Sequence, residues 1–414
     1  MNRLYAFFEG KLIGVLTQDE ENIYSFEYDQ NWNGFDLSLA MPVSQKKFGN
    51  KITLSFFENL LPEGEVKKSI ELHQKIKGTF EFLDHFGHDL AGAIIVTDDL
   101  TYIHSIDPKD NLKVEMAKIY NVIEEKGSVV EAISDMNPGY LSLAGAQDKF
   151  PAIYKEGHFY LPKKGGATTH IIKTPIVRSG VTDSVFNEFF CMSLAKKVGL
   201  NVPNIFILHG KSPLYVIERY DRVESDNLVL RIHQQDFCQA LGLGSNQKYE
   251  SKNGPSFKDC YDLLLNEISP SERFNSVTQI LDWLCFNILI GNNDSHAKNI
   301  SILFKEGKLI LAPFYDLLST EIYPKLSKDF SFFIGDRKEG NKIGKNKFNQ
   351  LEEDLGIKQN ALIDRMLNVQ EKVLGHKKEL MDSINEDFGN IKILKRIDDF
   401  ILNRIKSLSK QGIK

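Results

Sequence analysis

Three polar side chains near residue 300 have the types and the order that phosphoryl transfer requires. Asp294 and Asn299 stand in an Asp-x-x-x-x-Asn spacing, and Asp316 follows after two short apolar runs. In kinase-type transfer, one carboxylate orients the attacking hydroxyl, while an amide oxygen and a second carboxylate hold magnesium ions that neutralise the triphosphate. An ordinary polar connection between a helix and a strand can also contain such an Asp and Asn. The position of Asp316 favours the chemical interpretation.

The elements around these three residues are suited to hold them. Apolar residues between Val277 and Ile288 recur at helical spacing, which predicts a buried helical face. Gly291 can end that helix in a positive-φ conformation. The runs 299–304 and 308–314 predict two strands joined by a tight turn. A helix, a polar loop and a hairpin would therefore position the three side chains.

The composition is that of a soluble globular protein. The 414 residues, of which 42% are hydrophobic and 26% charged, are enough for two or three domains. The net charge of −5 gives no general bias toward nucleic acids or anionic membranes. The four cysteines lack a C-x-x-C spacing, which favours buried free thiols in a reducing compartment. No apolar run has transmembrane length and no signal peptide is evident, so we expect a cytoplasmic protein.

The first hundred residues predict a small α+β module of their own. Residue types alone indicate an accessory packing module or a partner-binding module. Strands are expected within 3–30 and at 91–99, and helices at 52–64, 66–75 and 78–85.

A small-residue segment and a strand lysine are candidates for phosphate binding. Ala144, Gly145 and Ala146 allow a ligand close to the backbone, and Lys149 carries a positive charge. A tight turn into a hairpin is the favoured local interpretation of this segment. Lys173 lies inside the apolar run 169–176, where a charged side chain needs a partner or a route to solvent.

Glu188, on a predicted helix after Lys173, is a candidate partner for that lysine. A strand lysine and a helical glutamate position the ATP α- and β-phosphates in kinases. A surface ion pair is the more common explanation of such a pair. The next predicted strand, 212–223, would end in a hinge at residues 218–220, whose backbone could contact an adenine.

The rest of the chain is expected to be mostly helical. The segment 335–347 is basic and rich in glycine, which favours a solvated loop over a nucleic-acid contact. Helices are predicted at 257–267, 271–290, 360–374, 376–387 and 391–410.

The segments LSLAGAQDKF (141–150), GNNDSHAKNISI (291–302) and APFYDLLS (312–319) occur in this order, and further related segments extend back to residue 56. In this combination the chain resembles the HipA family, the serine/threonine-kinase toxins of bacterial type II toxin–antitoxin systems. The resemblance implies an α+β, two-lobed protein-kinase-like fold. It would comprise an additional amino-terminal α+β module (1–106), an ATP-binding lobe (107–222) and a mostly helical carboxy-terminal lobe (223–414) with the catalytic loop and metal site.

The resemblance also implies a role for each candidate residue. Asp294 would be the catalytic aspartate, with Asn299 and Asp316 as magnesium ligands. Lys173 would bind the ATP phosphates, with support from Glu188. The implied nucleotide-binding residues are Ala144, Gly145, Ala146, Gln147, Asp148 and Lys149 in the phosphate loop, Lys173, Glu218, Arg219 and Tyr220 up to the hinge, and His296, Ala297, Lys298, Asn299, Tyr315 and Asp316 beside the catalytic loop.

Ser142 would be the site of autophosphorylation in this family pattern. On residue type alone it is a plain loop hydroxyl. A phosphoserine adds nearly two negative charges. Beside a loop that holds ATP phosphates, this charge would favour expulsion of the loop and self-inactivation.

By resemblance, the chain is an ATP- and Mg²⁺-dependent kinase that phosphorylates a serine of a translation protein. The implied target is an aminoacyl-tRNA synthetase such as the glutamyl enzyme, with growth arrest and persistence as the result. The implied partner is a helix-turn-helix antitoxin similar to HipB, and no membrane is involved. Some family members contact operator DNA through basic residues on a helix of the carboxy-terminal lobe, but the corresponding segment 351–355 is acidic here, so DNA contact is expected only through the antitoxin.

Two alternatives to a protein kinase toxin stay open at this point. The Asp-x-His-x-x-Asn pattern at 294–299 also suits a lipid or small-molecule kinase. The second alternative is a non-catalytic corepressor that keeps the fold only to hold an antitoxin, although a corepressor has no need of all four residues Asp294, Asn299, Asp316 and Lys173.

Overall fold

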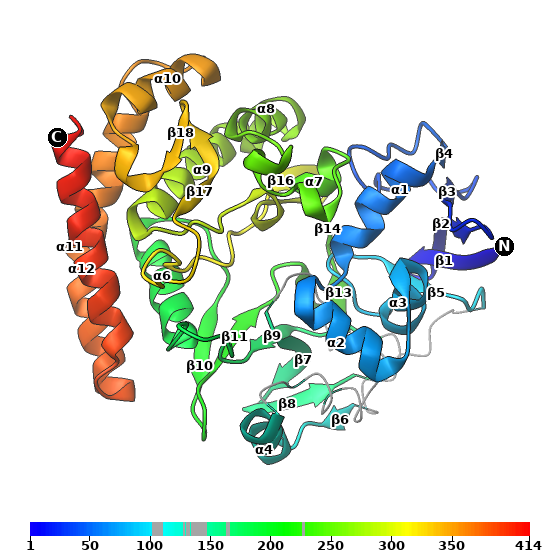
Figure 1. Ribbon diagram of the computed structural model, residues 1–414. Helices are drawn as coiled ribbons and strands as arrows, with labels where there is room; N and C mark the ends of the chain where they lie inside the picture. Colours follow the sequence, from blue (N-terminus) through cyan, green and yellow to red (C-terminus); the bar gives the residue numbers. More distant parts are fainter. Residues whose placement is uncertain (102–110, 127–128, 130–132, 134–146, 163–165, 226–227) are drawn as a thin grey trace. The chain divides into compact units, whose positions relative to one another are not determined.

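A computed structural model describes residues 1–101, 111–126, 129, 133, 147–162, 166–225 and 228–414 (Figure 1). The chain forms two compact units, and helices and strands occur in both, as the α+β prediction requires. The first unit comprises Met1–Thr174, Leu208–Ser245 and Leu303–Gly307, and the second comprises Pro175–Ile207, Asn246–Ile302 and Lys308–Lys414. The boundaries expected near residues 106 and 222 remain predictions.

A five-stranded antiparallel sheet in the order β4-β3-β2-β1-β5 begins the first unit. Alternate residues of its strands are buried, as in Tyr24, Phe26 and Tyr28, because one face of the sheet packs on helices. The strand expected at 91–99 is limited to Ile95–Thr97, since residues 88–92 enter a polar network described below. The elements are β1 (Asn2–Phe8), β2 (Lys11–Gln18), β3 (Tyr24–Tyr28), β4 (Lys47–Phe48), α1 (Asn50–Phe57), η1 (Glu58–Leu60), α2 (Gly64–Gln74), α3 (Gly78–Phe86) and β5 (Ile95–Thr97).

A second sheet of the first unit contains neighbouring strands in the order β11-β9-β7-β8-β6. The strand predicted over 212–223 ends at Glu218, and a separate hairpin begins at Arg222. The elements are β6 (Leu112–Lys113), α4 (Met116–Lys126), β7 (Lys149–Lys155), β8 (His158–Leu161), β9 (His170–Lys173), β11 (Leu214–Glu218), β12 (Arg222–Ser225), β13 (Leu228–Arg231), β14 (His233–Asp236), α7 (Phe237–Ala240) and, at the end of the segment, η3 (Ser245–Gln247).

The second unit is mainly helical and is organised around α9, against which α8, α11 and α12 pack. Its carboxy-terminal helices α11 and α12 run beside each other (Figure 1). The elements that lie wholly in this unit are α6 (Ser184–Val198), η4 (Glu250–Lys252), α8 (Phe257–Glu267), α9 (Pro270–Ile290), η5 (Ala297–Asn299), β16 (Lys308–Leu311), β17 (Asp329–Ile334), β18 (Arg337–Glu339), η6 (Gly340–Lys342), α10 (Lys345–Leu355), α11 (Ala361–Phe388) and α12 (Lys392–Lys410). Strands β10 (Ile205–Leu208) and β15 (Ser301–Lys305) begin in the second unit and end in the first.

Two sequence predictions in this unit are wrong. The helices expected at 360–374 and 376–387 form the single helix α11, which runs through Gly375. A glycine costs about 1 kcal/mol in a helix interior, and here the packing of α11 against α6 and α9 offsets that cost. The segment 335–347 is not one loop, because it contains strand β18, the short helix η6 and the first turn of α10.

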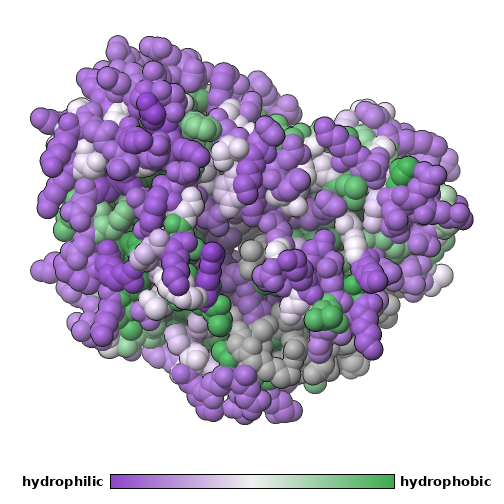
Figure 2. Space-filling model, in the orientation of Figure 1, coloured by the Kyte–Doolittle hydropathy of each residue, from purple (hydrophilic) through white to green (hydrophobic). Residues whose placement is uncertain are grey.

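The burial of side chains agrees with the composition. All four cysteines are buried and free, as predicted. Hydrophilic residues predominate on the face shown in Figure 2, and apolar residues form small separate patches there. Across the described residues, no helix combines the length and the apolar character needed to cross a membrane.

Candidate functional site

The candidate catalytic loop begins where α9 ends. Gly291 has φ of 69° and donates its backbone N–H to the Asn287 carbonyl, which is a common way to close a helix. A Cβ atom at this position would lie 2.5 Å from ring carbons of Phe400. Glycine is therefore required by both backbone conformation and space, and it turns the chain directly into residues 292–299.

Asn292 connects the end of α9 with two of the candidate site residues. Its side chain is fully buried. The Nδ2 group donates to Asn287 Oδ1 at 2.8 Å and to the Asp316 carbonyl at 3.2 Å, while Oδ1 accepts from the Asp294 backbone N–H at 3.2 Å. One side-chain amide thus holds the backbones of Asp294 and Asp316 together, although the two residues are 22 positions apart in the sequence.

Asp294 and Asn299 are held next to each other by the turn η5. Asn299 Nδ2 donates to the Asp294 carbonyl at 3.0 Å. This bond orients the amide, so Asn299 Oδ1 is the atom left to act as a ligand. The Asp294 side chain is 55% exposed, as a carboxylate that meets an acceptor molecule must be. Its Oδ1 atom accepts a hydrogen bond from the hydroxyl of Tyr249.

Asp316 has a strained backbone. Its φ is 55°, in the left-handed region that non-glycine residues rarely occupy. The neighbouring Tyr315 donates its hydroxyl to the Lys298 carbonyl at 2.6 Å, and that hydroxyl lies 3.1 Å from Ser301 Oγ. The strained residue is therefore held on one side by Asn292 and on the other by its own neighbour.

The donor set fits magnesium bound together with a nucleotide. In the described part of the chain, no group of three His, Cys, Asp or Glu residues could hold a metal ion. Mg²⁺ is commonly bound by only one or two protein oxygens plus substrate phosphates and water. Asn299 Oδ1 and the Asp316 carboxylate are oxygen donors of that kind, whereas a metal held by protein ligands alone does not fit.

The first unit contains the candidate phosphate-binding residues. Lys173 at the end of β9 is only 4% exposed, and its Nζ atom lies 5.7 Å from the centroid of the Tyr215 ring. Gln147 Nε2 donates to the Thr174 carbonyl at 3.0 Å, and the Asp148 carbonyl accepts from the Thr174 N–H at 3.3 Å. The end of the predicted phosphate loop is thus bonded to the end of the lysine strand, where Lys149 pairs in register with Lys173.

Several predicted residues cannot be placed with these. Ser142, Ala144, Gly145 and Ala146 lie outside the described residues. Glu188 is buried on α6 in the second unit, and its pairing with Lys173 stays a prediction.

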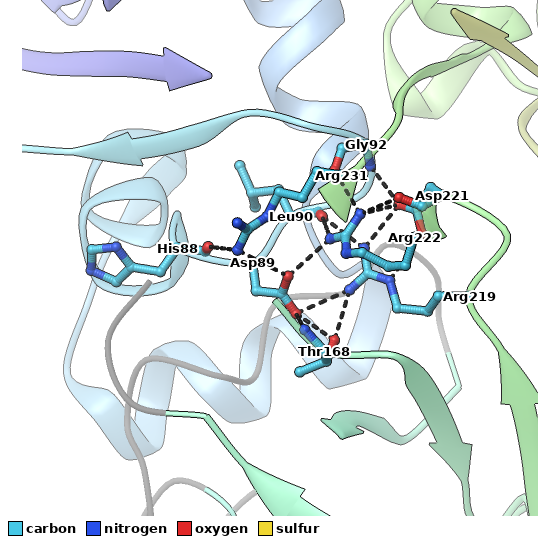
Figure 3. Close-up of polar contacts among 9 residues, drawn as sticks. All are labelled: His88, Asp89, Leu90, Gly92, Thr168, Arg219, Asp221, Arg222 and Arg231. Atoms are coloured by element: carbon cyan, nitrogen blue, oxygen red, sulfur yellow. Dashed lines mark hydrogen bonds and ion pairs between the residues drawn. The ribbon is translucent and has the colours of Figure 1, made fainter. Parts of the chain in front are cut away.

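The predicted adenine hinge is held by a buried network of charged groups (Figure 3). The Arg219 guanidinium uses all five of its N–H groups, on Asp89, Asp221, Thr168 and the Leu90 carbonyl, at 2.8 to 3.1 Å. The Arg219 backbone N–H also donates to the Thr169 carbonyl at 2.8 Å. Contact of Arg219 with a nucleotide would therefore involve its backbone carbonyl and not its side chain.

The same network binds the amino-terminal module to the hinge. Arg222 donates to Asp89 Oδ1 at 2.9 Å and to the Leu90 and Gly92 carbonyls at 3.0 and 2.8 Å, and Asp221 Oδ2 accepts the Gly92 N–H at 2.7 Å. Burial by itself raises the pKa of Asp221, but Arg219 and Arg222 outweigh it and hold that pKa below its usual range. The carboxylate is therefore charged at neutral pH and compensated.

Three residues of the site, Tyr249, Asn292 and Asp89, are not marked by the sequence. Tyr249 lies 45 residues before its partner Asp294, and Asp89 lies 130 residues before Arg219, so no local pattern marks these pairs. Asn292 was within the recognised loop, but its type gives no signal beyond that of a polar turn residue.

Comparison with known proteins gives consistent matches over nearly the whole chain. The family model described as HipA N-terminal domain matches residues 4–97, and the model described as HipA-like C-terminal domain matches residues 141–376. The serine/threonine-protein kinase toxin HipA of Shewanella oneidensis is 30% identical over 382 residues, which are 87% of this chain and 85% of that protein. The protein Y4mE of Sinorhizobium fredii, which is named as a kinase, is 37% identical over 346 residues, 81% of each chain.

A solved structure shows the same fold. In the complex of the Shewanella oneidensis toxin–antitoxin system HipA and HipB with its operator DNA, one chain superposes with a TM-score of 0.83 at 25% identity. The match covers 98% of this chain and 97% of that chain. The predicted two-lobed kinase-like fold with an amino-terminal module is thereby confirmed.

Proposed function

Since the chain belongs to the HipA family of serine/threonine-protein kinase toxins, we propose that it transfers the γ-phosphoryl group of ATP, with Mg²⁺, to a serine of a target protein. The observation that carries this proposal is the single amide of Asn292 that holds Asp294 and Asp316 together. Phosphoryl transfer needs one carboxylate that orients the acceptor hydroxyl and a second carboxylate, close to the first, that binds the metal.

In this proposal, Asp294 accepts a hydrogen bond from the acceptor hydroxyl and orients that oxygen toward the γ-phosphorus. A bond forms between the serine oxygen and phosphorus, the bond from phosphorus to the β,γ-bridging oxygen breaks, and the serine proton passes to the carboxylate. Asn299 Oδ1 and the Asp316 carboxylate hold Mg²⁺, which neutralises charge on the triphosphate. Lys173, Gln147, Asp148 and Lys149 bind the phosphates, the residues 218–220 meet the adenine, and Glu188 supports Lys173.

The proposal extends to target and partner. The target class is a translation protein, with an aminoacyl-tRNA synthetase such as the glutamyl enzyme as first candidate, and phosphorylation would arrest growth. The related solved structure contains HipB and operator DNA, which supports a helix-turn-helix antitoxin as partner here. Helix α10 carries Glu353 and Asp354 on its exposed surface, and these charges would repel DNA phosphates, so we assign DNA contact to the antitoxin.

Intact mass spectrometry tests the proposal. Dephosphorylated protein is incubated with Mg-ATP beside its Asp294→Asn and Ser142→Ala variants. A gain of one phosphoryl group (about 80 Da) in the parent, absent from both variants, is the expected result and would identify Ser142 as the autophosphorylation site. If the parent neither gains mass nor binds ATP, the kinase proposal fails.

A further inference from the structure

Tyr249 contacts the catalytic candidate Asp294 from a part of the chain that has no assigned role. Its hydroxyl donates to Asp294 Oδ1. The same oxygen lies 3.9 Å from His296 Nε2, and the Tyr249 ring meets the His296 ring edge to face, with centroids 5.1 Å apart. Both neighbours are therefore on the Oδ1 side of the carboxylate. Among the residues that the structure describes, none bonds to Oδ2.

The backbone around Tyr249 is well anchored. Its carbonyl accepts from the N–H groups of Lys252 and Gly254 at 2.9 and 3.0 Å. A Cβ on Gly254 would lie 2.2 Å from the Gln247 carbonyl oxygen, so only glycine permits this tight return of the chain. The preceding Lys248 carbonyl accepts from the Ala297 N–H at 3.3 Å, which joins the segment directly to the catalytic loop.

Two lysine side chains lie near the Tyr249 ring. The Nζ atoms of Lys248 and Lys252 lie 5.5 and 5.4 Å from its centroid, within the range of cation–π attraction. These contacts hold the ring in place without using its hydroxyl. The hydroxyl can therefore donate to Asp294 while the ring stays in place.

A carboxylate that must orient a hydroxyl works best when its own rotation is fixed. A hydrogen bond to Oδ1 sets the plane of the Asp294 carboxylate and leaves Oδ2 directed to the acceptor. We propose that Tyr249 is a positioning residue for Asp294, whose hydroxyl fixes the carboxylate so that Oδ2 receives the acceptor hydroxyl. This inference rests on the proposed kinase function and adds a residue to it.

The test is the Tyr249→Phe variant, which keeps the ring and its contacts and removes only the hydroxyl. Conversion of Mg-ATP to ADP with water as acceptor is measured for the parent, Tyr249→Phe, Asp294→Asn and the double variant, and nucleotide affinity is measured with a fluorescent ATP analogue. We expect kcat of Tyr249→Phe to fall about tenfold, the equivalent of one hydrogen bond. The KM for ATP and the affinity for the analogue should not change, because the hydroxyl does not contact the nucleotide in this proposal.

The double variant separates positioning from general structural damage. If the hydroxyl acts through the Asp294 carboxylate, the double variant should be no slower than Asp294→Asn alone. The matched control is Tyr120→Phe, which removes a hydroxyl that contacts the His209 carbonyl and should leave kcat unchanged.

Three outcomes would overturn the inference. A Tyr249→Phe variant as fast as the parent would show that the hydroxyl has no effect, and a faster one would show that it blocks the carboxylate. Additive losses in the double variant would show that Tyr249 acts independently of Asp294. A parent that neither turns over Mg-ATP nor binds the fluorescent analogue would instead remove the proposed function itself, and the two failures are therefore distinguishable.

Discussion

At the residue scale, the candidate site depends on neutral hydrogen-bonding groups as much as on carboxylates. Asn292 fixes two backbones, Asn299 is oriented by its bond to a carbonyl, and Tyr249 contacts the exposed carboxylate. Amides and hydroxyls can be buried at lower cost than charges when each is hydrogen-bonded. They can therefore hold the site in place without changing its net charge.

One titratable carboxyl group, that of Glu250 next to Tyr249, is expected to make stability depend on pH. Burial raises the pKa of Glu250 to about 7. The Phe333 N–H, which donates to Glu250 Oε2 at 2.7 Å, lowers this pKa by a smaller amount. The folded state then binds a proton that the unfolded state releases near pH 4.5. Between these values the folded state holds more protons, so the free energy of unfolding should fall as pH rises.

We expect Glu250→Gln to remove this part of the pH dependence. We compare the free energy of unfolding in urea at pH 5 and at pH 8. Between these two pH values it should fall by ~1–2 kcal/mol less in the variant than in the parent, after allowance for solvent screening of a partly exposed group. The exposed Glu353→Gln is the control and should behave as the parent does. The prediction would be contradicted if the free energy of unfolding changed by the same amount between pH 5 and pH 8 in the parent and in Glu250→Gln.

At the scale of elements, the end of α9 decides where the catalytic loop starts. The buried apolar face of the helix lies within the second unit. The helix ends where the Gly291 N–H donates to the Asn287 carbonyl. The Gly291 carbonyl then accepts the N–H groups of Thr320 and Glu321 at 3.0 and 2.9 Å. The helix terminus, the catalytic loop and the segment after Asp316 are in this way joined at one point.

Two glycine-to-alanine substitutions should have opposite effects. Gly291→Ala imposes a positive φ on a residue with a Cβ and brings that Cβ to 2.5 Å from Phe400, so we expect a loss of roughly 2–4 kcal/mol of stability. Gly375→Ala lies inside α11 with open space around it, and we expect a gain of about 0.5–1 kcal/mol. Both changes are measured by urea unfolding. Equal effects of the same sign would refute the explanation.

At the scale of the whole molecule, the amino-terminal module is part of the first folding unit and not an appendage. The carboxylate of Asp89, from that module, completes the network around Arg219 and Arg222 (Figure 3). Two guanidinium groups without this carboxylate would be buried and poorly compensated, which is costly. The module therefore supports the predicted hinge through charge compensation as well as through packing.

Asp89→Asn tests this dependence with little change in shape. We expect a loss of about 3–5 kcal/mol in the free energy of unfolding, because one partner of a buried ion network is removed. Glu65→Gln, which breaks an exposed pair with Lys68, is the control and should change stability by less than about 1 kcal/mol. A loss of similar size in both variants would show that the buried network has no special weight.

The sequence alone determined the class of the fold, most of the elements and the order of the candidate catalytic groups. These depend on local rules: apolar spacing predicts α9, a glycine marks its end, and Asp294, Asn299 and Asp316 lie close enough in the chain for their relation to be recognised. Local rules gave a wrong prediction at Gly375, where they placed a break between two helices. Tertiary contacts keep α11 continuous there.

Only the tertiary structure decided which distant groups support the site. The hydroxyl of Tyr249 on Asp294 and the carboxylate of Asp89 on Arg219 join segments 45 and 130 residues apart. Hydrogen bonds and ion pairs depend on distances in space that no local periodicity encodes, and burial gives these bonds their energetic weight. For the same reason, the strand expected to run through the hinge ends at Glu218, because the compensation of buried charge outweighs the local preference for an extended chain.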